Sequence, residues 1–186
     1  MDKNYVRMVM VLGIIGAIVA LALANVYKIT DPLIQKNRKQ TIKEAIKEVL
    51  PEAKTYKHKT VKEIDVYIGL DDTGKKIGYA FKSEGPGYQG TISVMAGANK
   101  ELTKLTGIYV MEQIETPGLG ARISEDDFQK SFRKLNIEDI IEYVKNKEPS
   151  KDNEIKSITG ATISSRSVVD NLNKTIDVLR KALKNG

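Results

Sequence analysis

The chain has 186 residues, of which 41% are hydrophobic, and carries a formal charge of +6 at pH 7. This length and composition are typical of one globular domain with an appendage. With no cysteine and a single histidine, His58, the sequence excludes disulfides, thiolate metal sites and iron–sulfur ligation, and it argues against a zinc site or a histidine-dependent triad. The remaining side-chain types can hold a cofactor, but they rarely perform redox or group-transfer chemistry unaided.

The positive charge is spread along the chain rather than clustered. Lysines and arginines alternate with acids, as in TIKEAIKEVL at 41–50, and no basic stripe with interleaved aromatics occurs. Because nucleic-acid binding needs a clustered basic surface, we expect no nucleic-acid partner. A positive surface that faces a membrane or an acidic partner stays open.

The first element is the uncharged stretch MVMVLGIIGAIVALALANVY at 8–27, after a short N-terminal tail at 1–7. As a helix, this stretch is long enough to cross about 30 Å of hydrocarbon. A cleaved signal peptide is the alternative, but its apolar part usually has about 7 to 15 residues and precedes a small-residue cleavage site. We therefore expect a retained transmembrane helix over 8–27.

Charges on the two sides of this stretch bear on its orientation. The basic residues are Lys3 and Arg7 before it, and Lys28, Lys36, Arg38 and Lys39 after it. Basic residues are usually more numerous on the cytoplasmic side, so this count favours a cytoplasmic C-terminal domain. The argument is weak, because a long domain can cross the membrane whatever its local charge.

Apolar residues at helical spacing follow over 42–50, and Pro51 ends the pattern. We expect a connecting helix within 28–55 and a globular domain over 56–186. In that domain, DVYIGL and KKIGYAF alternate in hydrophobicity around DDTG, which predicts a β-hairpin. Strand-like patterns continue in TISVMAG and KLTGIYVMEQI.

Helical patterns occupy the rest of the domain. Short helices are expected at DDFQKSF (126–132) and IEDIIEYV (137–144). A longer amphipathic helix closes the chain, with one apolar face formed by Val168, Leu172, Ile176, Leu179 and Leu183. The predicted fold is therefore an N-terminal transmembrane helix followed by an α+β domain, in which a mostly antiparallel sheet packs against helices.

GPGYQG at 85–90 fits the G-x-G-x-x-G dinucleotide fingerprint letter for letter. That fingerprint needs a helix after the glycines, because the helix N-terminus holds the pyrophosphate, and here a strand pattern follows. We therefore reject a Rossmann fold. The motif is either a plain loop between strands or a loop through which backbone approaches a planar ligand.

ETPGLG at 115–120 is a second glycine-rich motif. Pro117 fixes one φ, and Gly118 and Gly120 permit positive φ, so the segment is a rigid turn. As an isolated pattern it is more often a plain turn than part of a ligand site.

SITGATISSR at 157–166 places five hydroxyl side chains at the start of the C-terminal helix. One hydroxyl is enough to cap a helix. The surplus, with Gly160 and Ala161 keeping the approach open, favours a bound phosphate slightly over capping alone, because the helix N-terminus attracts anions. The five hydroxyls belong to Ser157, Thr159, Thr162, Ser164 and Ser165.

TGATISS resembles the S/T-G-A-T-x-S/T motif of the FMN-binding domain family. ETPGLG, the GPGYQG loop before a strand and the single N-terminal apolar stretch match the same family in the same order. The resemblance covers essentially the whole chain. It is strongest to the membrane-anchored flavoproteins of Rnf-type complexes, with those of the sodium-pumping NADH:quinone reductases second. One position departs, since Lys156 stands where the family usually has an acid, six residues before Thr162.

The resemblance implies that FMN is attached to Thr162 by a phosphoester bond, that a dedicated flavin transferase places it there from FAD, and that the domain lies outside the cytoplasmic membrane. It further implies an electron-transfer subunit of an ion-translocating ferredoxin:NAD oxidoreductase, which needs other membrane subunits to form a complete enzyme. The remaining residues expected around the flavin are Thr159, Gly160, Ala161, Ser164, Ser165, Glu115, Thr116, Gly118, Leu119, Gly120, Gly87 and Tyr88, with no metal ligand.

Two alternatives stay open beside this interpretation. One is a free-standing, membrane-anchored flavoprotein. The other is an anchored binding module without a cofactor, in which the hydroxyls only cap the helix. Purification from the native membrane separates the first from a component of a larger complex, and the presence of flavin separates the second.

Overall fold

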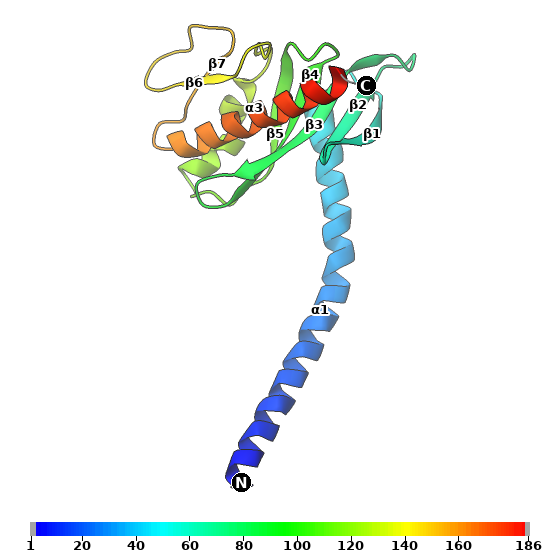
Figure 1. Ribbon diagram of the computed structural model, residues 1–186, viewed down its shortest axis with the longest axis vertical. Coiled ribbons are helices and arrows are strands. Elements are labelled where there is room, and N and C mark those ends of the chain that lie inside the picture. The colour runs from blue at the N-terminus through cyan, green and yellow to red at the C-terminus, as the bar shows by residue number, and fades with distance from the viewer. Residues whose placement is uncertain (1–2, 185–186) are drawn as a thin grey trace. The chain divides into compact units, whose positions relative to one another are not determined.

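The structure is a computed structural model that describes residues 3–184 (Figure 1). The chain divides into two compact units, Met1–Thr41 and Ile42–Gly186. Helix α1 (Lys3–Val49) forms the described part of the first unit and ends inside the second.

Helix α1 runs unbroken through the stretch expected to span a membrane and on to Val49, with Pro32 inside it. Its apolar side chains are exposed, Leu12 at 72% and Leu21 at 66%, so the helix buries neither of them within the protein. Within residues 3–184, it is the one helix long and apolar enough to cross a membrane, by length and composition.

The second unit is built on a five-stranded sheet in which neighbouring strands are antiparallel and follow the chain order β1-β2-β3-β4-β5. The strands are β1 (Thr55–Val61), β2 (Ile64–Leu70), β3 (Lys76–Pro86), β4 (Thr91–Asn99) and β5 (Leu105–Glu112). The hairpin expected around DDTG is confirmed. Asp71 Oδ1 accepts hydrogen bonds from the N–H groups of Thr73 at 2.8 Å and Lys75 at 2.9 Å, and Gly74 adopts φ +77°.

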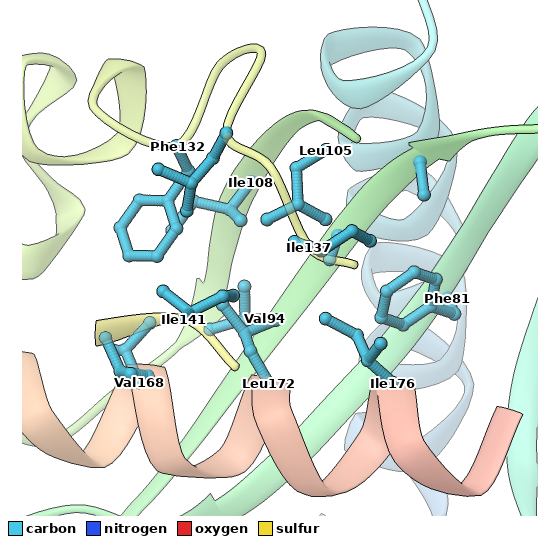
Figure 2. Packing of buried hydrophobic residues seen from close by; sticks show 14 of the residues in the cluster. Phe81, Val94, Leu105, Ile108, Phe132, Ile137, Ile141, Val168, Leu172 and Ile176 are labelled. Atoms are coloured by element: carbon cyan, nitrogen blue, oxygen red, sulfur yellow. The ribbon is translucent and has the colours of Figure 1, made fainter. Parts of the chain in front are cut away.

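Helix α3 (Thr162–Lys184) covers one face of this sheet. Leu172 of α3 and Phe81 of β3 are fully buried in the main core, as the predicted apolar face requires (Figure 2). Strand residues alternate between the two faces. On the other face, Met95 of β4 packs in a second hydrophobic cluster with Ile46 and Val49, which lie in the last turns of α1. The predicted α+β fold is confirmed.

Four short elements lie between β5 and α3: a 3₁₀ helix, η1 (Gly120–Ser124), helix α2 (Asp126–Lys130), and strands β6 (Glu142–Val144) and β7 (Glu154–Lys156), which pair in parallel. The short helix expected in DDFQKSF is therefore confirmed.

The helix expected in IEDIIEYV is wrong, because this segment bends into β6. Ile141 donates its N–H to Asn173 Oδ1 at 2.8 Å, and Asn173 Nδ2 donates to the Ile141 carbonyl at 2.9 Å. With both of its backbone groups bonded to a side chain of α3, Ile141 cannot take part in a helical ladder. The buried spacing of Ile141 and Val144 suits a helix as well as this bend, so the sequence pattern was misleading.

Candidate functional site

The three motifs singled out in the sequence meet at one carboxylate, that of Glu115. GPGYQG forms the turn from β3 to β4, closed by a hydrogen bond from Gly87 N–H to the Gly90 carbonyl at 2.6 Å. Glu115 Oε1 accepts hydrogen bonds from the N–H groups of Tyr88 at 2.8 Å and Gln89 at 3.0 Å. The ETPGLG motif is thereby tied to the GPGYQG turn.

The second oxygen of the same carboxylate reaches the third motif. Ser164 Oγ, in the first turn of α3, donates a hydrogen bond to Glu115 Oε2 at 2.5 Å. Both side chains are buried, since Glu115 is 5% exposed and Ser164 is 3% exposed. We call this arrangement the carboxylate clamp: Glu115, the N–H groups of Tyr88 and Gln89, and the Ser164 hydroxyl.

Two of the predicted glycines make room for the clamp. A Cβ on Gly87 would lie 2.4 Å from Glu115 Oε1, and a Cβ on Gly120 would lie 2.6 Å from both Glu115 Oε2 and Ser164 Oγ. Real side chains do not approach so closely, and the neighbours are held by hydrogen bonds. The absence of side chains at Gly87 and Gly120 therefore admits the protein's own carboxylate.

The rest of ETPGLG is a turn that faces outward. The Thr116 carbonyl accepts hydrogen bonds from the N–H groups of Leu119 at 3.2 Å and Ala121 at 3.1 Å, and Gly118 has φ +73° with open space around it. A Cβ on Gly160 would lie 3.3 Å from Leu119 Cδ2. This turn therefore lies directly against the TGAT segment, as a shared ligand site requires.

Three of the five hydroxyls in SITGATISSR have internal partners. Ser157 Oγ donates to the Val144 carbonyl at 3.0 Å, Ser164 belongs to the carboxylate clamp, and Ser165 Oγ donates to the Ala161 carbonyl at 3.0 Å while accepting the Ile158 N–H at 3.0 Å. Ser165 is fully buried. A contact between phosphate and Ser164 or Ser165 stays a prediction.

The two threonines take no part in this network. Thr159 is exposed, and Thr162, the first residue of α3, is half-buried. Gly160 adopts φ +82°, a conformation that glycine favours, and Ala161 is buried behind the turn. The first-turn N–H groups of a helix lack intrahelical acceptors and attract anions. Thr162 is thus a hydroxyl at the edge of a site suited to a phosphate.

Each of the three motifs contains an exposed apolar side chain or has one next to it. These side chains are Tyr88 at 65% exposed, Ile114 at 68%, Leu119 at 47% and Ile163 at 55%. Leu119, which lies against Gly160, and Ile163, which follows Thr162, place apolar surface beside the helix N-terminus.

Sequence reasoning missed Ile114 and Ile163. Ile163 directly follows Thr162 but lies off the apolar face of α3 that begins at Val168, so the helical period could have marked it as an exposed apolar residue. Ile114, after β5, lies over Gly90, before β4, so that a Cβ added to Gly90 would stand 2.2 Å from Ile114 Cδ1. No local sequence pattern predicts this contact.

Cations close in sequence to the motifs are already paired with acids. Arg166 Nε lies 3.1 Å from Asp170 Oδ2, and Arg122 Nε lies 3.2 Å from Glu125 Oε2. Lys156, the position that departs from the family pattern, is exposed and pairs with Glu148.

Comparisons with known proteins agree with this geometry. Residues 87–177 match the family model of the FMN-binding domain. The chain is 34% identical to the G component of the ion-translocating oxidoreductase complex of Methanosarcina acetivorans, over 95% of both chains. It is 31% identical to the G component of the Na⁺-translocating ferredoxin:NAD⁺ oxidoreductase complex of Acetobacterium woodii, over 98% of this chain and 95% of the relative. Its fold is similar to the crystal structure of Shewanella oneidensis NqrC, with a TM-score of 0.58 at 20% identity, over 69% of this chain and 64% of the other.

Proposed function

Because this chain belongs to the family of G components of ion-translocating oxidoreductase complexes and contains an FMN-binding domain, we propose that it is the membrane-anchored flavoprotein of such a complex and carries FMN covalently on Thr162. The complex is of the ferredoxin:NAD⁺ oxidoreductase type named for the Acetobacterium woodii relative. The chain is one electron-transfer subunit and not a complete enzyme.

The observation that carries this proposal is the position of the Thr162 hydroxyl and its lack of a part in the hydrogen bonds of the neighbouring serines. This hydroxyl lies at the N-terminus of a 23-residue helix, outside the hydrogen-bond network that occupies the neighbouring serines. The helix N-terminus stabilises a phosphate through its free N–H groups and its partial positive charge. A phosphoester on Thr162 would place the FMN phosphate at this helix end.

The residues around Thr162 would hold and orient the cofactor. When bound, FMN supplies the capacity to accept and pass one or two electrons. Tyr88, Leu119 and Ile163 offer apolar surface for an aromatic ring, and Thr116 and Gly118 present backbone in an open turn. The covalent bond would keep the cofactor on the chain even when these noncovalent contacts open.

The membrane anchor and the partner subunits belong to the same proposal. Helix α1 anchors the chain, and the globular domain lies on the extracytoplasmic side, where a flavin transferase modifies it. Residues 8–27 contain no charged side chain. Since ion and proton paths through membranes need ionisable or polar groups, the path for the translocated ion lies in other subunits of the complex.

The test is covalent flavin on the purified chain. Co-expressed with a flavin transferase, the exported protein is expected to fluoresce on a denaturing gel and to gain the mass of FMN less one water. Trypsin cleaves after Lys156 and Arg166, so the peptide 157–166 contains Thr162 and the four other hydroxyls of the motif. Fragmentation of the labelled peptide should place the flavin on Thr162.

Thr162→Val removes the hydroxyl at nearly constant volume and is expected to abolish the label. Thr60→Val, the same change on the exposed edge strand β1, should leave labelling unchanged. Label on another residue, or full labelling of Thr162→Val, contradicts the acceptor assignment. A wild-type chain that binds no flavin supports the binding module without a cofactor. Purification from the native membrane without other integral membrane subunits supports the free-standing flavoprotein.

A further inference from the structure

We propose that Glu115 and Ser164 are positioning residues, which hold Thr162 in the orientation that a flavin transferase requires; this inference rests on the proposed attachment at Thr162. The carboxylate clamp is complete within the chain and uses both oxygens of Glu115. Glu115 therefore acts on attachment through the first turn of α3 and not through contact with the reacting atoms.

Helix geometry links Ser164 to Thr162. Successive residues of an α-helix are about 100° apart around its axis, so side chains two residues apart point about 200° apart. Ser164 is turned inward and is 3% exposed, whereas Thr162 is half-buried at the surface. Fixing the Ser164 hydroxyl on Glu115 therefore fixes the rotation of the first turn that presents Thr162.

The other end of the clamp is anchored in the sheet. Glu115 Oε1 is bonded to two consecutive N–H groups in the turn between β3 and β4, and β3 pairs with β4 continuously from Gly78 to Pro86. The start of α3 is thus tied to the most extensively paired part of the fold.

Glycine supports this assignment independently. Gly87 and Gly120 stand where any Cβ would collide with the Glu115 carboxylate or the Ser164 hydroxyl. Two of the three motifs therefore contain a glycine whose effect is to admit the clamp. The third motif supplies its hydroxyl donor close to the acceptor threonine.

The modification step shows why orientation matters. Thr162 Oγ attacks the phosphorus atom of FAD that bears riboflavin, the bond from this phosphorus to the oxygen of AMP breaks, and AMP leaves. The hydroxyl proton passes to a base and then to solvent, and no electron is transferred. Attack on phosphorus needs the hydroxyl close and aligned, and a misplacement of about 1 Å can slow such a step on the order of 10²-fold.

The test uses the full-length chain in detergent, purified flavin transferase and FAD. Initial rates of covalent labelling, measured at several concentrations of the acceptor chain, give kcat and KM separately. The variants are Ser164→Ala and Glu115→Gln, which remove or weaken the bond between α3 and the carboxylate. The matched control is Ser157→Ala, which also removes one buried serine hydrogen bond, to the Val144 carbonyl, but leaves the clamp intact.

Positioning predicts that Ser164→Ala lowers kcat about 10- to 100-fold, that Glu115→Gln lowers it by less, and that KM changes little. Ser157→Ala should keep the wild-type kcat while losing a similar amount of thermal stability. Wild-type kcat in both clamp variants, or an equal loss of kcat in Ser157→Ala, overturns the positioning role of Glu115 and Ser164. Neither result contradicts the proposed attachment of FMN to Thr162. Wild-type labelling of Thr162→Val overturns the proposed function, and this inference with it.

Discussion

Leu119 lies against Gly160, so that a Cβ on Gly160 would stand 3.3 Å from Leu119 Cδ2. The two residues belong to separate motifs, and their contact brings the ETPGLG turn to the TGAT segment. Gly160 also has φ +82°, where residues other than glycine are strained. Gly160→Ala is therefore expected to cost about 1–2 kcal/mol of stability and to reduce covalent flavin strongly, because it shifts the turn before Thr162.

Gly118→Ala is the matched control for this prediction. Gly118 has a similar φ of +73°, but nothing lies within 4 Å of its Cβ position. Its stability loss should equal that of Gly160→Ala, with a smaller effect on labelling. Melting temperatures and labelling yields of the two variants, measured side by side, check the prediction; equal labelling would mean that contact with Leu119 does not matter.

Local patterns were sufficient to predict much of this fold. The DDTG hairpin depends on Asp71, whose carboxylate accepts N–H groups two and four residues later, and α3 depends on one apolar face in a single segment. Both are decided by residues that are neighbours in sequence, so their signals survive without tertiary information. The TGAT, ETPGLG and GPGYQG segments could be singled out for the same reason.

The arrangement of the site could not be predicted in this way. Ser164 and Glu115 are separated by 49 positions, and a hydroxyl at a helix start is equally compatible with capping, phosphate binding and a bond to a distant carboxylate. The bend at Ile141 likewise depends on Asn173 in another element. The hydrogen bond between Ser164 and Glu115 and the bend at Ile141 therefore depend on residues far apart in the sequence, which local patterns do not reveal.

The end of α1 is also held to the sheet by a part-buried hydrogen bond, whose acceptor belongs to the buried Val49. Thr106 Oγ1 of β5 donates a hydrogen bond to the Val49 carbonyl at 2.5 Å, and Gly97 leaves the space for it, since its Cβ would lie 2.4 Å from that oxygen. Thr106→Val keeps the volume but leaves the carbonyl without this donor. We expect a loss of about 1–3 kcal/mol in the free energy of unfolding, measured by chemical unfolding of the full chain in detergent.

Thr41→Val is the control for Thr106→Val. Thr41 Oγ1 also donates to a backbone carbonyl, that of Asn37, but this hydrogen bond is exposed to solvent. Water can replace this bond, so the change should cost less than about 0.5 kcal/mol. If the two variants unfold alike, the contact between Thr106 and Val49 contributes no more than an exposed hydrogen bond.

Glu154 gives the domain a predicted dependence on pH. Its side chain is 4% exposed, and the hydrogen bond from the Ser150 N–H, followed by that from the Lys151 N–H, lowers the pKa of its carboxyl below the ordinary value. A carboxyl whose pKa is lower in the folded than in the unfolded state stabilises the fold above its unfolded pKa, about 4.3, and loses this contribution as the pH falls through its folded pKa. Wild type should therefore be more stable than Glu154→Gln at neutral pH, and the difference should shrink below about pH 4.

Melting temperatures of both proteins across this range measure the effect. Glu148→Gln, in the segment that precedes β7, is the control, because Glu148 is 78% exposed and its ion pair with Lys156 is open to water; such pairs contribute little. This variant should follow the wild-type profile. A Glu154→Gln profile parallel to wild type at every pH would show that the lowered pKa has no consequence for stability.

Labelling of single introduced cysteines can test on which side of the membrane the domain lies. The sequence has no cysteine, so a single introduced thiol is the only target for a maleimide reagent. Lys3→Cys marks the start of α1 and Lys147→Cys marks an exposed loop of the domain. With the domain outside, a membrane-impermeant maleimide should label Lys147→Cys in intact spheroplasts, whereas Lys3→Cys should react only after the membrane is permeabilised. The opposite pattern would place the domain in the cytoplasm, as the basic residues that follow the span favour, and the flavin transferase would then have to act on that side.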